Sequence, residues 1–122
     1  MWYTAHVVIQ LRTKEEPQAE FCVWENVILI EAKNEEEALE KAEVRGREDE
    51  GEFGLTINGK SAEFVYVGLR KLMACSDGER TPSDGTELSF NRLYFASQQD
   101  LDDFAEGKEV PATFDDEEPL DE

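Results

Sequence analysis

The segment Val27–Glu43, VILIEAKNEEEALEKAE, joins a strongly apolar run to an acidic run through Asn34. Four aliphatic residues in succession are too few for a membrane span and are typical of a strand that is buried on both faces. Asn34 is a preferred N-cap residue, because its side chain accepts hydrogen bonds from the first amides of a helix. The three glutamates that follow place negative charge at the positive end of the helix dipole. The segment therefore predicts a central strand and a helix that begins after Asn34.

The predicted helix has a capped start and a narrow apolar stripe. Glu37 lies three residues after Asn34, which predicts a capping box in which the Glu37 carboxylate accepts from the Asn34 amide. Apolar or small residues then recur at spacings of three and four. They are Ala38, Leu39, Ala42 and Gly46. Because these side chains are small, we expect the helix to lie close to one face of a sheet.

Two strands are predicted before the helix. Residues 2–11 alternate, with Tyr3 and Ile9 on one face and His6 on the other. A polar loop at 12–19 closes a hairpin with a second strand at about 20–32. In this second strand the polar pair Glu25 and Asn26 interrupts the apolar pattern, which predicts a β-bulge.

The chain after the helix predicts further strands and a second helix. Asn58-Gly59 indicates a two-residue hairpin between a short strand and a longer one at about 62–73, which alternates Phe64, Tyr66 and Gly68 with Val65, Val67 and Leu69. A turn-rich loop leads to a last predicted strand at 87–96. Ser97 is then expected to begin a short helix that ends at Gly107.

These elements predict an α+β fold. We expect an antiparallel sheet of four to five strands in the order ββα(β)ββα, packed by one main helix, with a short C-terminal helix. Residues 1–107 are expected to form a single domain and residues 108–122, with seven acids and one lysine, an acidic disordered tail. One helix cannot cover both faces of so apolar a sheet. We therefore expect self-association, such as a homodimer, or partner binding through the second face.

The charge of the chain restricts its partners. Among 122 residues, 30 are acidic and 12 basic, and the formal net charge is -18. Such a field repels nucleic acid phosphates and anionic membranes, so we expect no direct contact with either. It suits a basic protein partner or simply solubility. Because the chain enters a strand at once and has neither a signal peptide nor a long apolar segment, we expect a cytoplasmic protein.

Several stretches together resemble a family of small, uncharacterised bacterial domains of unknown function. They are Trp2-Tyr3, residues 27–32 with 36–42, Phe64–Gly68 and Gly85–Tyr94. The likeness covers roughly residues 2–96, and its most specific part is the Trp-Tyr opening combined with the Gly-Thr-Glu closing strand. The resemblance implies a compact α+β unit in a bacterial cytoplasm. It implies no activity and no catalytic residue.

The sequence gives weak indications of metal or nucleophile sites. His6 is the only histidine, and no spacing to carboxylates or to Cys22 supports a metal site. Cys22 lies on the neighbouring strand and could approach His6, but a thiol on an apolar strand is usually inert. We expect a structural His6 and two reduced thiols, Cys22 and Cys75. Four acids crowd the turn-rich loop but lack the spacing of a calcium-binding EF-hand. They are Asp77, Glu79, Asp84 and Glu87. We therefore expect no metal, no cofactor and no catalytic residue.

Five residues are the candidates for a binding surface: Trp2, His6, Trp24, Asn26 and Arg92. If their strands pair as neighbours, they converge on the sheet face away from the Asn34 helix and form an aromatic and polar patch. The alternative interpretation covers both tryptophans with the short C-terminal helix.

Three functions follow as hypotheses. The first is a non-enzymatic protein-interaction module, so that the protein is not an enzyme. The second is an acidic inhibitor or DNA mimic that occupies a basic nucleic-acid-binding protein. The third is a small enzyme that uses His6 or Cys22, which would require a concave pocket around them.

Overall fold

A computed structural model describes residues 1–14, 21–51 and 53–115 and has the expected α+β fold. The chain divides into two compact units, Met1–Ser89 and Phe90–Glu122, whereas we expected a boundary at 107/108. Residues 15–20 of the expected loop and 116–122 of the expected tail lie outside the described residues. In chain order the elements are β1 (Trp2–Thr13), β2 (Cys22–Glu31), α1 (Glu35–Glu48), β3 (Thr56–Ile57), β4 (Lys60–Ala74), β5 (Leu93–Tyr94), α2 (Gln98–Ala105) and β6 (Thr113–Phe114).

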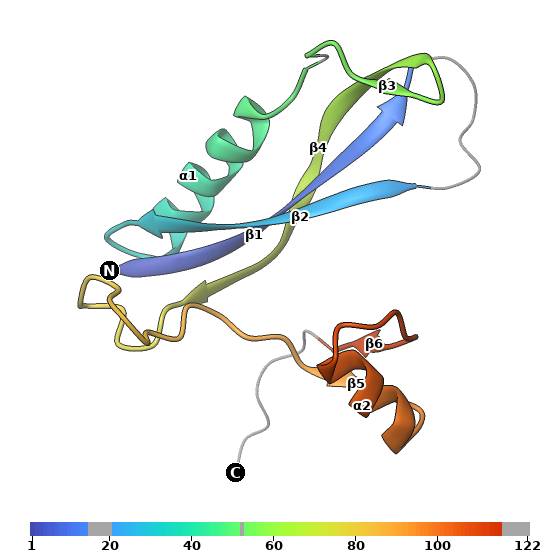
Figure 1. Cartoon of the computed structure of the whole chain (residues 1–122). Coiled ribbons are helices and arrows are strands. Elements are labelled where there is room, and N and C mark those ends of the chain that lie inside the picture. The colour runs from blue at the N-terminus through green and yellow to red at the C-terminus, as the bar shows by residue number, and fades with distance from the viewer. Residues whose placement is uncertain (15–20, 52, 116–122) are drawn as a thin grey trace. The chain divides into compact units, whose positions relative to one another are not determined.

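The first unit is an antiparallel sheet with one helix. Its strand order is β2-β1-β4-β3, so the long strand β1 lies between β2 and β4. In Figure 1, α1 lies along one face of this sheet. The hairpin between β3 and β4 turns through Asn58 and Gly59, both with positive φ, which confirms the predicted two-residue turn. In the described part of the chain, no helix is both long and apolar enough to cross a bilayer.

Helix α1 begins as predicted. The side chain of Asn34 accepts a hydrogen bond of 2.9 Å from the amide of Glu37. The Glu37 carboxylate accepts from the Lys33 amide at 3.4 Å, one residue earlier than expected. The buried face consists of Ala38, Ala42 and Gly46. Leu39, which we placed on the stripe, is 45% exposed, because four residues at these spacings span more of the helix surface than the sheet covers.

The core lies between α1 and the face of β1 that carries the odd-numbered side chains. Tyr3 and Ala5 pack there with Ala38 and Ala42 and with Ile30 of β2. The approach is close, since a Cβ on Gly46 would lie 2.6 Å from the ring of Tyr66. The small stripe therefore sets the distance between helix and sheet.

Two β-bulges in β4 alter the predicted alternation. The register with β1 shifts between His6 and Val7 and again between Val8 and Ile9, which leaves Arg70 and Val67 as the extra residues. The bulge that we expected at Glu25–Asn26 is absent, because β1 and β2 pair continuously from Trp2 to Leu11. Consequently Leu69 packs on the core, although simple alternation placed it on the face opposite Phe64 and Tyr66.

The predicted closing strand at 87–96 was wrong for most of its length. Residues 85–92 join no ladder, and Leu93–Tyr94 pairs with Thr113–Phe114 in the second unit. Glu87–Ser89, here called the closing segment, instead makes hydrogen bonds to groups of β1 and of the β4 end. Thr4 Oγ1 donates to the carbonyl of Leu88 at 2.6 Å, and the amide of Ser76 donates to the carbonyl of Glu87 at 3.2 Å.

The second unit contains α2, β5 and β6. The side chain of Ser97 accepts from the amide of Asp100, so this helix begins as predicted. Gly107, with a φ of 86°, follows the cap and donates to the carbonyl of Phe104. Phe95 packs against Phe104 with ring centroids 5.0 Å apart. Residues 113–114, expected in the disordered tail, form β6.

Candidate functional site

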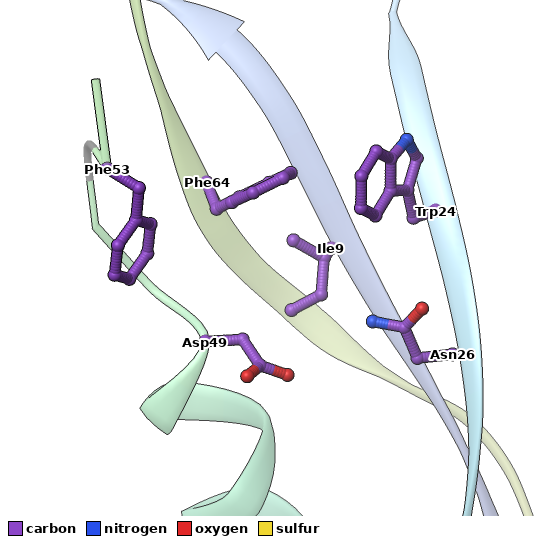
Figure 2. Close-up of a pocket in the computed structure, with 6 residues that line it drawn as sticks. All are labelled: Ile9, Trp24, Asn26, Asp49, Phe53 and Phe64. Atoms are coloured by element: carbon purple, nitrogen blue, oxygen red, sulfur yellow. The ribbon is translucent and has the colours of Figure 1, made fainter. Parts of the chain in front are cut away.

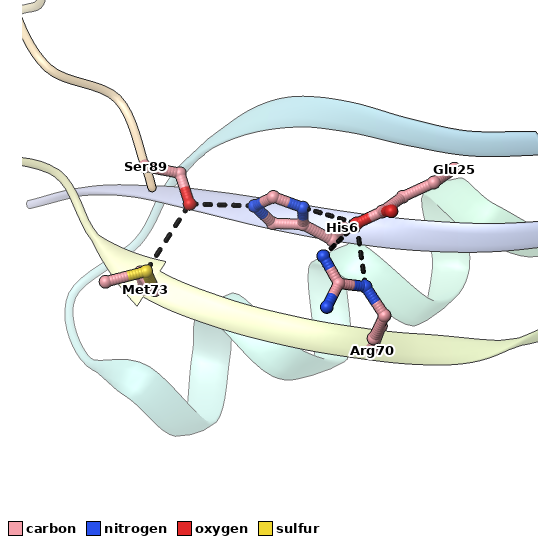
Figure 3. A network of polar contacts seen from close by, with 5 residues as sticks. All are labelled: His6, Glu25, Arg70, Met73 and Ser89. Carbon is pink, nitrogen blue, oxygen red and sulfur yellow. Dashed lines mark hydrogen bonds and ion pairs between the residues drawn. The ribbon is translucent and has the colours of Figure 1, made fainter. Parts of the chain in front are cut away.

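The first candidate site is a polar network on the sheet face that α1 does not cover. His6 on β1 lies between Glu25 on β2 and Ser89 of the closing segment, and Figure 3 shows the imidazole bridging them. His6 Nδ1 is 2.7 Å from Glu25 Oε2, and Nε2 is 2.8 Å from Ser89 Oγ. Arg70 donates to the same Oε2 through Nε at 2.9 Å and through Nη2 at 2.6 Å. The His6 ring thus joins β1 to β2 and to the closing segment, and the Glu25 carboxylate joins β4 to the same network.

The bulge at Arg70 explains this geometry. The Cα partner of His6 on β4 is Lys71 and that of Val7 is Leu69, so Arg70 is the extra residue of the bulge between them. A bulge re-aims the side chain that it adds. Arg70 is therefore free of the regular alternation and reaches Glu25 two strands away. The bulge therefore supplies the one additional side chain of β4 that lies beside His6 and can contact Glu25.

The charges of the network favour an ionised Glu25. Burial raises the pKa of Glu25, but hydrogen bonds from Arg70 and His6 outweigh that effect and leave the pKa below its ordinary value of 4.5. A carboxylate that accepts from both groups holds the imidazole with Nδ1 as the donor. Nε2 of a neutral ring then accepts from the Ser89 hydroxyl, which also lies 3.4 Å from the sulfur of Met73.

The order serine, histidine, carboxylate is that of a nucleophilic triad. Two features restrain such chemistry here. The His6 side chain is 4% exposed, and Arg70 neutralises the carboxylate that would stabilise an imidazolium. The network also satisfies buried groups, since no buried side-chain nitrogen or oxygen of the described residues lacks a hydrogen-bond partner. The geometry thus fits a structural role, in which the network holds the closing segment against the sheet, and leaves hydrolysis as an alternative.

The cysteines do not join this network as a nucleophile pair. Cys22 is exposed and pairs with Leu11, five residues along β1 from His6. Cys75 is buried directly after β4, and its sulfur lies 3.2 Å from Thr4 Oγ1. Both thiols are free. In residues 1–14, 21–51 and 53–115, no group of three or more His, Cys, Asp or Glu side chains is arranged to hold a metal ion.

The second candidate site is an apolar row on β2. Among the described strands, β2 has β1 as its one neighbour and therefore forms an edge of the sheet. Side chains of Val23, Val27 and Leu29 alternate along the face opposite α1 and are 49%, 53% and 43% exposed. Edge strands with exposed apolar side chains are templates for pairing with another chain. This set is called the β2 row below.

The third candidate site is an aromatic groove on the other sheet face, beyond the C-terminal end of α1. It is an open hollow of about 340 Å³, and Figure 2 shows its lining side chains turned toward a common space. Trp24 and Phe64 have ring centroids 4.9 Å apart, and Phe53 lies 6.4 Å from Phe64. Among the residues that the structure describes, the lining consists of Ile9, Trp24, Asn26, Asp49, Phe53 and Phe64.

The five predicted binding residues do not meet on one surface. Trp24 and Asn26 pair with Ile9 and Val7 and lie in the groove, on the side of α1. Trp2 and His6 belong by alternation to the opposite face. The predicted convergence failed because Trp2 and His6 share their face with the odd-numbered residues of β2, not with Trp24.

Arg92, the fifth candidate, belongs to the second unit. Its guanidinium lies 3.5 Å from the carboxylate of Asp115, and its carbonyl accepts from the Asp115 amide at 2.8 Å. Its acid lies in the stretch that we expected to be disordered.

Sequence reasoning missed the residues that share the groove with Trp24 and Asn26. Phe53 and Asp49 follow the helix, and only the fold brings them opposite Trp24. An aromatic residue flanked by Gly51 and Gly54 was a usable indication, because a positive φ at 46° holds Phe53 in an exposed turn. Nothing in the sequence indicated that Ser89 reaches His6.

Comparisons with known proteins agree with the boundary of the first unit. No curated protein and no solved structure matches the chain. A family match begins at residue 2 and ends at residue 89, so it spans the sheet, α1 and the closing segment up to the serine that contacts His6. The match covers most of the chain and agrees with the resemblance to small uncharacterised domains. The chain belongs to the DUF4288 family, a domain of unknown function.

Proposed function

We propose that this protein is a non-enzymatic interaction module that takes an extended segment of a basic protein along the outer edge of β2. The observation that carries the proposal is the β2 row, because it combines an edge strand with an exposed apolar face. Strand addition derives affinity from main-chain hydrogen bonds and specificity from alternate side chains.

Charge favours a basic partner over a second copy. Residues 1–89 contain 19 acids and 10 bases, so two copies of this unit repel each other as they approach. A basic segment is attracted by the same field, and its association is faster at low salt. The hypothesis of an acidic inhibitor remains a special case in which that basic partner is a nucleic-acid-binding protein.

Peptide selection followed by substitution tests the proposal. Peptides selected from a random display library on the full chain should combine apolar with basic residues at alternate positions. The double variant Val27→Ser, Leu29→Ser should weaken their binding by about tenfold or more, because it removes two apolar contacts at once. Calorimetric titration measures the change.

A matched control is offered by α1. Val44 and Leu39 are also exposed, at 62% and 45%, but lie on the helix. Val44→Ser, Leu39→Ser should change the affinity by less than about twofold. Equal weakening by both double variants would show that general surface hydrophobicity binds the peptides and would remove the proposal.

A second candidate function is ester or amide hydrolysis with Ser89 as nucleophile and His6 as base. It is favoured by the serine, histidine, carboxylate order and by distances of 2.8 and 2.7 Å. Hydrolysis of activated p-nitrophenyl esters by the full chain, abolished in Ser89→Ala and retained in Ser83→Ala, would support it. Equal rates in both variants would exclude Ser89.

A further inference from the structure

The aromatic groove has the composition of a cation site. Three aromatic rings, from Trp24, Phe53 and Phe64, lie around a hollow that also contains the carboxylate of Asp49. The faces of aromatic rings attract ammonium and guanidinium groups, with tryptophan the strongest. Trp24 and Phe53 are 49% and 68% exposed, so a ligand could cover much of their surface.

The backbone adds to the preference for positive charge. Helix α1 ends at Glu48, and Asp49 is its C-cap, so the negative end of the helix dipole lies beside the groove. Asp49 lies 3.3 Å from Arg45, but both side chains are about half exposed, and such a pair is weak. A cation in the groove can therefore compete for the same carboxylate.

We propose that the aromatic groove holds a lysine or arginine side chain of a protein partner. Ile9 gives the hollow an apolar floor for the alkyl stem, the rings and Asp49 receive the charged head, and Asn26 offers a side-chain carbonyl as an acceptor. A protein partner is favoured as the source, because Trp24 and Asn26 lie on the same edge strand as the β2 row. A segment paired with that strand would direct alternate side chains to the helix side.

Tryptophan fluorescence gives a direct test. The chain has two tryptophans, so Trp2→Phe leaves Trp24 as the single reporter. Blocked Ala-Lys-Ala and Ala-Arg-Ala tripeptides should change its emission saturably, with a dissociation constant on the order of millimolar. A blocked Ala-norleucine-Ala tripeptide, equal in stem length but uncharged, should bind at least about threefold more weakly.

Substitutions separate the groove from the general acidic field. Asp49→Asn should weaken the lysine peptide about fivefold, and Phe53→Ala about threefold. Glu48→Gln is the matched control, since Glu48 also contacts Arg45 at the same helix end but does not line the groove. It should change the affinity by less than about twofold.

Specific outcomes would overturn the proposal. Equal binding of the norleucine peptide would make the groove a purely apolar pocket, and equal effects of Asp49→Asn and Glu48→Gln would assign the attraction to bulk charge. Butylammonium binding as tightly as the lysine tripeptide would point to a free amine instead of a protein side chain. Absence of any saturable change would leave no site. The tripeptides test the groove and the selected peptides test the β2 row in separate experiments. The tripeptides can therefore bind even if docking on the β2 row fails, and docking on the β2 row can succeed even if the tripeptides do not bind.

Discussion

Two neighbouring residues of β1, one on each face of the strand, are equally buried and are held by different forces. On the face toward α1, Ala5 is 0% exposed and packs against small helix residues. On the other face, Thr4 is also 0% exposed, but a hydrogen bond to the closing segment accompanies its burial. One face depends on apolar contact and the other on polar groups that find partners. Equal burial therefore does not imply equal sensitivity to the same kind of change.

The largest effect is expected from a cavity on the helix face. Ile30→Ala removes a side chain from the core cluster and should lower the free energy of unfolding by about 2–4 kcal/mol. Its neighbour Leu29 is 43% exposed on the opposite face, and Leu29→Ala should cost less than about 1 kcal/mol. Urea unfolding of both variants measures the difference. Similar losses would mean that the open face is also packed.

A second effect tests the polar face. Residues 1–89 should unfold cooperatively, and a chain that ends at residue 86 should be less stable by about 2–4 kcal/mol, because Thr4 and His6 lose partners while buried. Thermal unfolding followed by circular dichroism compares the two chains. If they unfold at the same temperature, the closing segment does not belong to the first unit.

The smallest effect concerns pH. Glu25→Gln should cost about 1 kcal/mol at pH 7, because the ion pair with Arg70 is partly exposed. The pKa of Glu25 is lowered in the folded state, so the contribution of its charge is present above pH 4.5 and is lost as the pH falls through the folded value. The difference from the wild type should therefore shrink at pH 3. A difference that stays constant with pH would assign the loss to shape and not to charge.

Local signals predicted the elements that depend on a few neighbouring residues. Asn34 and Ser97 each specify a helix cap through their own side chain, Asn58-Gly59 specifies a turn through its own backbone, and each was found as predicted. The prediction of a strand at 87–96 was wrong because alternation of apolar and polar residues does not distinguish two cases. In one the segment pairs with a strand through its backbone, and in the other it contacts the sheet through isolated hydrogen bonds that involve side chains. Ser89 and Leu88 use a side-chain oxygen and a carbonyl for that purpose.

The candidate sites depended on register, which the sequence leaves open. Trp24 was assigned to the face of His6 but lies on the opposite face, because both faces of β2 are apolar and alternation alone does not distinguish them. The contact of Arg70 with Glu25 depends on the bulge at Arg70, and no residue type near Arg70 predicts a bulge from the sequence. Asp49 could not be assigned to the groove from the sequence, because only the position of the end of α1 against the sheet brings it there.

The two bulges of β4 compensate for each other in the alternation of side chains along the strand. One extra residue reverses the face that simple alternation assigns to every residue beyond it, and the second extra residue restores that face. Phe64 and Leu72 therefore both face α1, although Val67 and Arg70 lie between them. Deletion of Val67 alone, or of Arg70 alone, should remove one bulge and leave every remaining residue opposite its present partner on β1, so both ends of the strand should keep their faces. Deletion of Arg70 should in addition remove the guanidinium that holds Glu25. Length in this strand is thus tolerated where a bulge takes up the extra residue.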